Sequence, residues 1–277
     1  MNVGLKLKTL EQVMKRVVIL DVDRTLHPRV SCLSLLDELV SMGAVAARHR
    51  SAVRGPHVAY HMGRSSHARM TELTTRVCAN VLAAVDEDLL ASAARQVWAK
   101  ERRAPFAFVG PLLTVLRSHA VAPVIVSGSP AAIVSVIAHD LGVHEVHAAV
   151  NAKKDTVKRI LASHAATGAG CFAVGGTGGD VDALEQVEHA IAYEPDREFL
   201  SRAGGQGWPV ADRGTVHELV KERLHQMAST DACTAGAADA ARCGSDWSYV
   251  SMCALYAAHR SELTWPRRDH IGLRMRS

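Results

Sequence analysis

The chain has 277 residues, of which 48% are hydrophobic and 22% are charged, an ordinary globular composition. Its formal net charge is only +4 and its basic residues are scattered, which argues against a nucleic-acid partner. Six widely spaced cysteines include no C-x-x-C pair, which argues against a zinc site or a disulfide framework and predicts a reduced, cytoplasmic setting. No segment approaches the ~20 apolar residues of a membrane-spanning helix, so no membrane contact is expected.

The first strand is expected at Val17–Leu20, a short apolar run that fits a strand buried on both faces. Residues 1–16, which include this strand's approach, are expected to form an amphipathic lead-in. Residues 31–118 carry apolar side chains at helical spacing with few β-branched runs. This pattern predicts four or five helices without a strand, and therefore an inserted helical cap.

From residue 121 the predicted strands and helices alternate, which is typical of a doubly wound parallel sheet. The expected strands are Ala122–Val126, Glu145–Val150, Cys171–Val174, Ala190–Tyr193 and Gly207–Val210. The expected helices are Ser129–Leu141, Lys154–His164, Asp182–Val187, Glu198–Ala203 and Val216–Met227.

The predicted architecture is an α/β core of residues 1–30 and 119–227 with a helical cap at 31–118. Residues 228–277 are expected to be a linker and a C-terminal extension, because the first part is rich in small and polar residues. One helix is expected there, at Tyr249–Leu263.

Polar groups follow four of the predicted strands. Asp21 and Asp23 come directly after the first strand and point to the same side of an extended backbone. Two neighbouring carboxylates repel each other unless a cation or a shared proton lies between them. One carboxylate can attack phosphorus while the second transfers a proton, so this pair is the leading catalytic candidate.

The other loops supply groups that suit a phosphoryl ligand. Ser127 and Gly128 offer a hydroxyl and backbone amides at the start of a helix, which can bind an anionic oxygen. Lys153 offers a positive charge for phosphate just before another helix. A glycine-rich loop, GGTGG, precedes Asp180.

This ordered set resembles the haloacid dehalogenase superfamily, in particular its phosphoserine-phosphatase-like branch with a helical cap. The resemblance covers residues 17–227 and rests on the motifs DVDRTL, VSGSP, KKDTVKRI and GGTGGDVDAL with the following AIAYEPD. It implies that Asp21 is the nucleophile that becomes aspartyl phosphate and that Asp23 is the general acid and base. Thr25 would shape the loop, Ser127 and Gly128 would bind the phosphoryl group, and Lys153 would neutralise its charge. Asp21, Asp23 through its backbone carbonyl, and Asp180 would hold Mg²⁺.

Two positions depart from the family pattern. Gly176 stands where the first, metal-binding Asp of the acidic motif is expected, with Asp180 at the second. A water could fill this position, or Asp180 or Asp182 could reach the metal along the flexible loop. In the other register Gly179-Asp180 would be the Gly-Asp pair, but the strand would then end early.

The second departure concerns the substrate. Val30 stands where phosphoserine phosphatases carry a Glu for the substrate ammonium, and an apolar side chain cannot pair with that group. Arg76 matches an Arg of the cap that binds the substrate carboxylate in the family.

Each of these residues also has a structural interpretation. Ser127 and Asp180 could be helix caps, and Arg76 could be an ordinary arginine on a helix surface.

The hypothesis is a Mg²⁺-dependent phosphate-monoester hydrolase that acts on a small phosphorylated metabolite through an aspartyl phosphate on Asp21. The alternative, motivated by Gly176, is a catalytically impaired relative that binds a phosphorylated ligand or a protein partner. A phosphotransferase with an acceptor other than water fits the sequence equally well, whereas dehalogenase chemistry would leave Asp23 without a role.

Overall fold

The computed structural model describes residues 16–228, and its contacts divide the chain after Leu224. The fold below is that of residues 16–224, and the described part of the second unit, residues 225–228, is helical. The expected lead-in before residue 16, the linker and the helix at Tyr249–Leu263 lie outside the described residues. No helix within 16–228 is long and apolar enough to cross a membrane.

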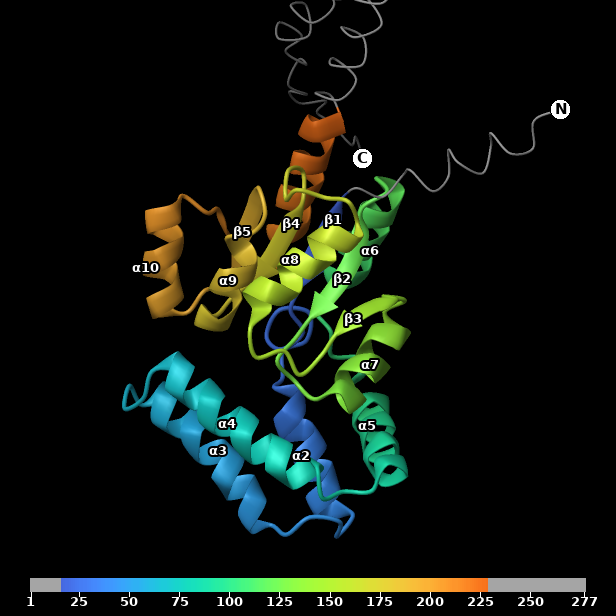
Figure 1. Ribbon diagram of the computed structural model, residues 1–277, viewed down its shortest axis with the longest axis vertical. Helices are drawn as coiled ribbons and strands as arrows, with labels where there is room; N and C mark the ends of the chain where they lie inside the picture. Colours follow the sequence, from blue (N-terminus) through green and yellow to red (C-terminus); the bar gives the residue numbers. More distant parts are fainter. Residues whose placement is uncertain (1–15, 229–277) are drawn as a thin grey trace, which may run out of the picture. The chain divides into compact units, whose positions relative to one another are not determined.

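Six parallel strands form one sheet in the order β3-β2-β1-β4-β5-β6 (Figure 1). The strands are β1 (Val17–Leu20), β2 (Ala122–Val126), β3 (Glu145–His147), β4 (Phe172–Gly175), β5 (His189–Tyr193) and β6 (Val210–Ala211). The chain runs outward from β1 to β2 and β3 and then returns to the other side of β1 as β4. The carboxyl ends of β1 and β4 therefore form the switch point at which such sheets place their ligands.

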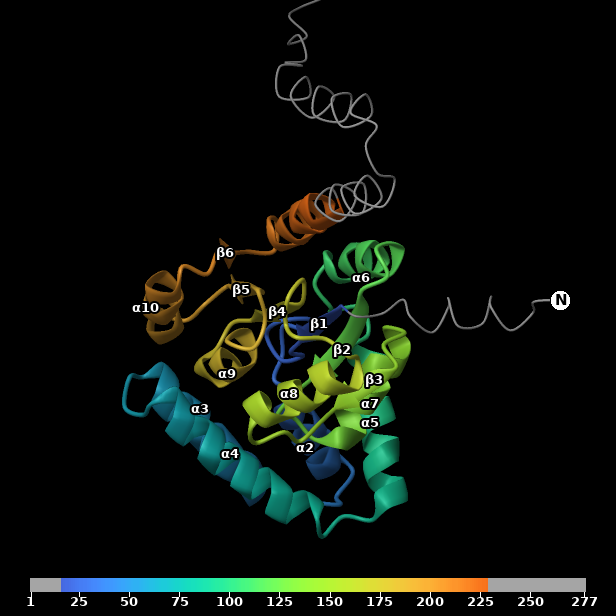
Figure 2. The ribbon, with the colours of Figure 1, turned by 45° about the horizontal axis from the view of Figure 1, so that its top comes forward.

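Helices cover both faces of the sheet (Figure 2). One face packs against α8 (Lys153–Ser163), α9 (Val181–Leu184) and α10 (Arg197–Gln206) through a cluster of buried aliphatic residues that includes Ile19 and Ala173. The other face carries α6 (Val109–Ser118), which packs on β2 and buries Leu112 and Leu116. All four residues of β1 are buried, as expected for a central strand between two helical layers.

Five helices and no strand lie between β1 and β2. They are α2 (Ser31–Ser41), α3 (Arg48–His61), α4 (His67–Leu82), α5 (Glu87–Glu101) and α6. α3 and α4 pack side by side away from the sheet, α2 packs against α3 and α5, and α5 packs against α7 (Ala131–Asp140). A small cluster of buried side chains, including Cys32, Val53 and Cys78, joins α2, α3 and α4.

The sequence predicts most elements to within a few residues, with two informative exceptions. β3 ends at His147 rather than at Val150, because the amide of Val150 donates to the Ser127 carbonyl oxygen and follows that loop. β6 begins at Val210 rather than at Gly207. Gly207 adopts a left-handed conformation (φ 69°) that ends α10, which is a position suited to glycine.

Candidate active site

The loop after β1 is a compact turn around one carbonyl group. The oxygen of Val22 accepts hydrogen bonds from the amides of Thr25, Leu26 and His27, and Arg24 has a positive φ of 63°. The turn buries Thr25 and points the carboxylates of Asp21 and Asp23 toward the carboxyl edge of the sheet. Thr25 thus lies within the turn and does not line the cavity described below.

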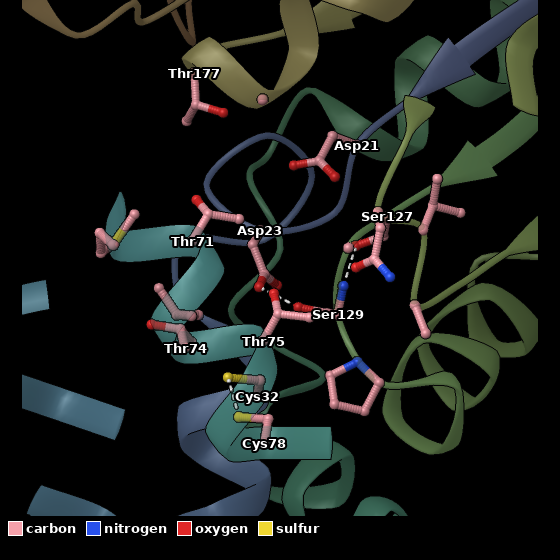
Figure 3. Close-up of a pocket in the computed structure, with 18 of the residues that line it drawn as sticks. Asp21, Asp23, Cys32, Thr71, Thr74, Thr75, Cys78, Ser127, Ser129 and Thr177 are labelled. Carbon is pink, nitrogen blue, oxygen red and sulfur yellow. Dashed lines mark hydrogen bonds between the residues drawn. The ribbon is translucent and has the colours of Figure 1, made fainter. Parts of the chain in front are cut away.

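Asp23 is held by two groups that the sequence did not single out. Its Oδ1 accepts the amide of Ser31 at 3.0 Å, so this carboxylate serves the N-terminus of α2, where Val30 offers no capping side chain. Its Oδ2 accepts the hydroxyl of Ser129 at 2.6 Å (Figure 3). These bonds fix the carboxyl group beside the catalytic loop.

The loop after β2 brings a hydroxyl to the same edge. Ser127 is buried, and its Oγ accepts the amide of Ser129 at 3.3 Å. Ser127 and Gly128 line the same cavity as Asp21, and phosphate binding by this loop stays a prediction. The amide of Ser127 is itself bound to the carbonyl of His147, so its position follows from the pairing of β2 and β3.

Lys153 lies between two carboxylates. Its Nζ is 2.9 Å from Asp21 Oδ1 and 2.6 Å from Asp180 Oδ1. The three side chains are largely buried, which keeps water from screening their charges. Lys153 is the first residue of α8, one position earlier than expected, and it reaches the edge between β1 and β4 from there.

Asp180 is fully used by hydrogen bonds within the protein. Its Oδ2 accepts the amides of Gly176 and Thr177 at 3.1 and 3.0 Å and the Thr177 hydroxyl at 2.9 Å. Its Oδ1 is the Lys153 partner. Asp180 therefore closes the glycine-rich loop on itself and positions Lys153.

Burial dominates the protonation of these groups. Burial raises the pKa of Asp21 to about 7, because the effect of Lys153 is offset by the negative charges of Asp180 and Asp23. Burial also raises the pKa of Asp23, although the hydrogen bonds from Ser129 and Ser31 act in the opposite direction.

Lys153 and Asp180 are shifted the other way. Burial acts to raise the pKa of Asp180, but the charge and hydrogen bond of Lys153 outweigh it and lower this pKa. The pKa of Lys153 is raised because both carboxylates outweigh its burial. Lys153 and Asp180 thus form a charged pair at neutral pH, while Asp21 is close to its titration midpoint.

A cavity of about 450 Å³ opens in front of these residues. Its core side is formed by Asp21, Asp23, Ser127 and Lys153, and its opposite side is formed mainly by α4 (Figure 3). The α4 residues that line it include Thr71, Thr74, Thr75 and Cys78, with Cys32 of α2 beside them. These residues could not be predicted from the sequence, because helical spacing alone does not tell which face of a helix meets a cavity.

The family model for the haloacid dehalogenase-like hydrolases matches residues 18–205, which span the catalytic loops and the intervening helices. The chain belongs to this hydrolase family. The resemblance predicted from the motifs is thereby confirmed. No curated protein is similar enough in sequence to match the chain.

Solved structures of the same fold include proteins of the phosphoserine phosphatase group. A Bordetella pertussis Tohama I protein of unknown function has a TM-score of 0.55 at 19% identity, covering 72% of this chain and 98% of its own. A probable phosphoserine phosphatase from Vibrio cholerae has a TM-score of 0.54 at 11% identity, covering 79% and 68%. A phospho-aspartyl intermediate analogue of phosphoserine phosphatase has a TM-score of 0.51 at 15% identity, covering 72% and 94%. These likenesses confirm the predicted fold class.

The donors at the site do not fit a tightly held Mg²⁺ ion. Mg²⁺ needs several oxygen ligands in near-octahedral geometry. Asp180, predicted as a ligand, has both oxygens engaged by Lys153 and by the loop itself, which leaves Asp21 and the backbone carbonyl of Asp23 as the other expected ligands. Within residues 16–228, no group of three or more His, Cys, Asp or Glu side chains is placed to hold a metal ion. The structure thus pairs Asp180 with Lys153, and the part of Asp180 in metal binding stays a prediction.

Gly176 lies where the surrounding backbone leaves no room for a side chain. A Cβ atom built on it would lie 2.4 Å from the carbonyl oxygen of Tyr193, a contact that real Cβ atoms do not make. At Gly175 a Cβ atom would instead overlap the Asp180 side chain, at 2.4 Å from its Cβ. The loop is therefore packed around glycine at both positions, and a metal-binding carboxylate does not fit there without a backbone shift.

Arg76 and Val30, the two positions considered for substrate recognition, lie in different places relative to the cavity. Arg76 lies on the exposed face of α4, pairs with Glu72 and is not among the residues that line the cavity. The structure therefore does not bring Arg76 to the cavity, and its contact with a substrate carboxylate stays a prediction. Val30 does line the cavity and presents an apolar surface there.

Proposed function

We propose that this protein hydrolyses a small phosphate monoester through an aspartyl phosphate on Asp21. The observation that carries the proposal is the contact of Lys153 with Asp21 at the switch point of the sheet, with Ser127 at the same cavity wall. Lys153 and the loop amides supply fixed positive charge where the transferring phosphoryl group would lie.

The reaction needs Asp21 without its proton and Asp23 with one. An oxygen of Asp21 attacks phosphorus, the bond from phosphorus to the alcohol oxygen breaks, and Asp23 gives its proton to that oxygen. Asp23 then takes a proton from a water molecule that attacks the aspartyl phosphate, which releases phosphate and restores Asp21. The raised pKa of Asp23 suits the first step.

Both steps of this reaction involve only Asp21, Asp23, the ester and water. The Mg²⁺ dependence expected from the family stays a prediction, which an assay with EDTA and with added Mg²⁺ tests. We place the reaction in the cytoplasm, since the neighbouring Cys32 and Cys78 are thiols that are not joined by a disulfide.

The deciding experiment is a p-nitrophenyl phosphate assay with the wild-type protein, Asp21→Asn and the control Asp140→Asn, whose side chain is exposed at the end of α7. We expect turnover by the wild type and the control, and loss of at least about a thousandfold in Asp21→Asn. The wild type quenched during turnover should carry one phosphoryl group on Asp21 by mass spectrometry. Undiminished activity of Asp21→Asn would refute the mechanism.

A second candidate is a protein that binds a phosphate ester without turning it over. The specific observation in its favour is the lack, within residues 16–228, of a three-carboxylate metal group. Wild-type turnover above the Asp21→Asn level would exclude this candidate. Binding of the ester without such turnover would support it.

A further inference from the structure

The two sides of the cavity differ in charge. Asp21, Asp23 and Lys153 are charged groups of the core side. The side formed by α2, α4 and α5 is lined by neutral residues, which include Val30, Cys32, Thr74, Thr75, Leu82 and Leu90. We call this side the neutral wall.

The neutral wall gives no partner to a charged leaving group. The substrate ammonium of an amino-acid ester would meet Val30, and its carboxylate would not meet Arg76, because Arg76 pairs with Glu72 outside the cavity. A charge left without a partner in a half-buried site is unfavourable, more so than an unpaired neutral polar group.

Other polar groups of the cavity lie elsewhere. Arg24 and three histidines, His57, His61 and His67, line it as well. Arg24 is exposed to solvent, and burial lowers the pKa of His57 and His67, so these two rings are neutral at neutral pH. They belong to the turn after β1, to α3 and to the start of α4, whereas the neutral wall runs along α4 toward α5.

The neutral wall carries hydroxyl groups as well as apolar surface. Thr74 is 8% exposed, and its buried Oγ1 has no hydrogen-bond partner. Thr71 and Thr75 flank it on the same side of α4 (Figure 3). Threonine offers a methyl group and a hydroxyl that can donate or accept, which suits an uncharged ligand with few polar atoms.

The cavity also has room for more than a phosphoryl group. Its volume of about 450 Å³ lies in the range of small-molecule sites, ~300–1,000 Å³. The line from Asp21 past Thr75 to Cys78 and Cys32 leads away from the catalytic residues along α4 (Figure 3). A leaving group attached to a phosphoryl group at Asp21 would extend in this direction.

We propose that the substrate is the phosphate monoester of an uncharged, largely apolar alcohol, whose body packs on the neutral wall between Val30 and Thr74. This inference rests on the proposed function of the same site. It assigns specificity to Val30 and to the threonines of α4, and it excludes phosphoserine as the preferred substrate.

Binding measured without turnover tests the inference separately from the function. Asp21→Asn, which keeps the neutral wall intact, is titrated by calorimetry with n-hexyl phosphate and with O-phospho-L-serine. We expect hexyl phosphate to bind at least about tenfold more tightly, because additional methylene groups are removed from water. Equal or tighter binding of phosphoserine would overturn the inference. Failure of the wild type to hydrolyse any ester would instead overturn only the proposed function.

Variants locate the preference on the wall. In the Asp21→Asn background, Val30→Glu should weaken hexyl phosphate binding at least about tenfold, by placing a carboxylate against the apolar chain. The matched control is Val58→Glu, since Val58 is 55% exposed on α3 and does not line the cavity. Equal effects of the two variants would contradict the proposal.

Because Val30 directly precedes α2, Val30→Glu also changes the start of that helix. A second variant, placed on α4, avoids this effect. Ala79 lies one turn beyond Thr75 on α4, lines the cavity and is exposed, so Ala79→Leu is compatible with the fold. It should weaken binding of hexyl phosphate and leave ethyl phosphate unchanged. If Ala79→Leu weakened the binding of both esters equally, or changed the binding of neither, the alcohol would not extend along α4.

Discussion

The two sides of the cavity are built by different means. The core side consists of Asp21, Asp23 and Ser127 in loops that follow strands and of Lys153 at the start of α8. Hydrogen bonds hold these residues, and that of the Ser127 amide to the His147 carbonyl follows from the pairing of β2 with β3. The neutral wall consists of residues of α2, α4 and α5, which belong to the insertion between β1 and β2. The same insertion contacts the core through the hydrogen bond from Tyr60 of α3 to Asp196.

The difference separates chemistry from selectivity. Charges on the core side are arranged so that Lys153 compensates Asp180 and leaves Asp21 close to its midpoint at neutral pH. The neutral wall can change its side chains without disturbing these ion pairs, because Thr71 and Thr75 make none of them.

The largest effect is expected from Lys153→Met. It removes the cation between two buried carboxylates, and we expect kcat/KM to fall by about 10²- to 10³-fold. Lys154→Met is the matched control, since Lys154 is exposed beside it, and should stay within about twofold of wild type. Similar rates for the two variants in a p-nitrophenyl phosphate assay would show that Lys153 has no part in the chemistry.

The pH dependence should follow Asp21. With its pKa near 7, the ionised nucleophile decreases about tenfold per pH unit below that value. On the acid side kcat/KM should therefore rise with pH toward about 7, and on the alkaline side it should fall as Asp23 loses the proton that the leaving group needs. The profile is corrected for the ionisation of the substrate phosphate, near pH ~6. In Lys153→Met the midpoint should move upward, because Lys153 lowers this pKa. A midpoint near the ordinary value for aspartate, 3.8, would contradict the burial argument.

The raised pKa of Asp21 makes the folded protein less stable as the pH rises. A carboxyl group whose pKa is raised in the folded state binds more protons folded than unfolded. The stabilisation of the folded state by protonated Asp21 is therefore lost as the pH rises from 3.8 to about 7.

Gly176→Asp should damage the protein and should not restore a metal site. The new Cβ atom would overlap the Tyr193 carbonyl, so we expect the free energy of unfolding to fall by about 2 kcal/mol or more. Gly110→Asp is the control, because nothing lies within 4 Å of a Cβ atom there, in the first turn of α6. Denaturant unfolding measures both. A gain of Mg²⁺-dependent activity in Gly176→Asp would show that the missing carboxylate alone limits metal binding.

The smallest effect is expected from Tyr60→Phe on the cap. Tyr60 donates to Asp196 Oδ2 at 2.5 Å, while Asp196 Oδ1 accepts the amide of Phe199 and caps α10. Removing the hydroxyl leaves the cap of α10 intact, so kcat/KM should fall only a few-fold, by about two- to tenfold. The variant should show the same substrate preference as the wild type. A changed preference would mean that Tyr60 itself contacts the alcohol.

The sequence by itself determined the α/β fold and the residues of the core side. Asp21, Ser127 and Lys153 were predictable because each follows a short apolar strand or opens a helix, and parallel strands bring their carboxyl ends to one edge. Gly176 could also be recognised as unusual from its position in the motif.

Only the tertiary structure decided what these residues contact. The pairing of Asp180 with Lys153, and the bonds of Asp23 to Ser129 and to the α2 amide, join segments that are distant in sequence. The outward direction of Arg76 and the inward direction of Thr74 depend on how α4 is rotated against the core. That rotation is set by packing between helices rather than by the period of any one of them, so the composition of the neutral wall could not be read from the sequence.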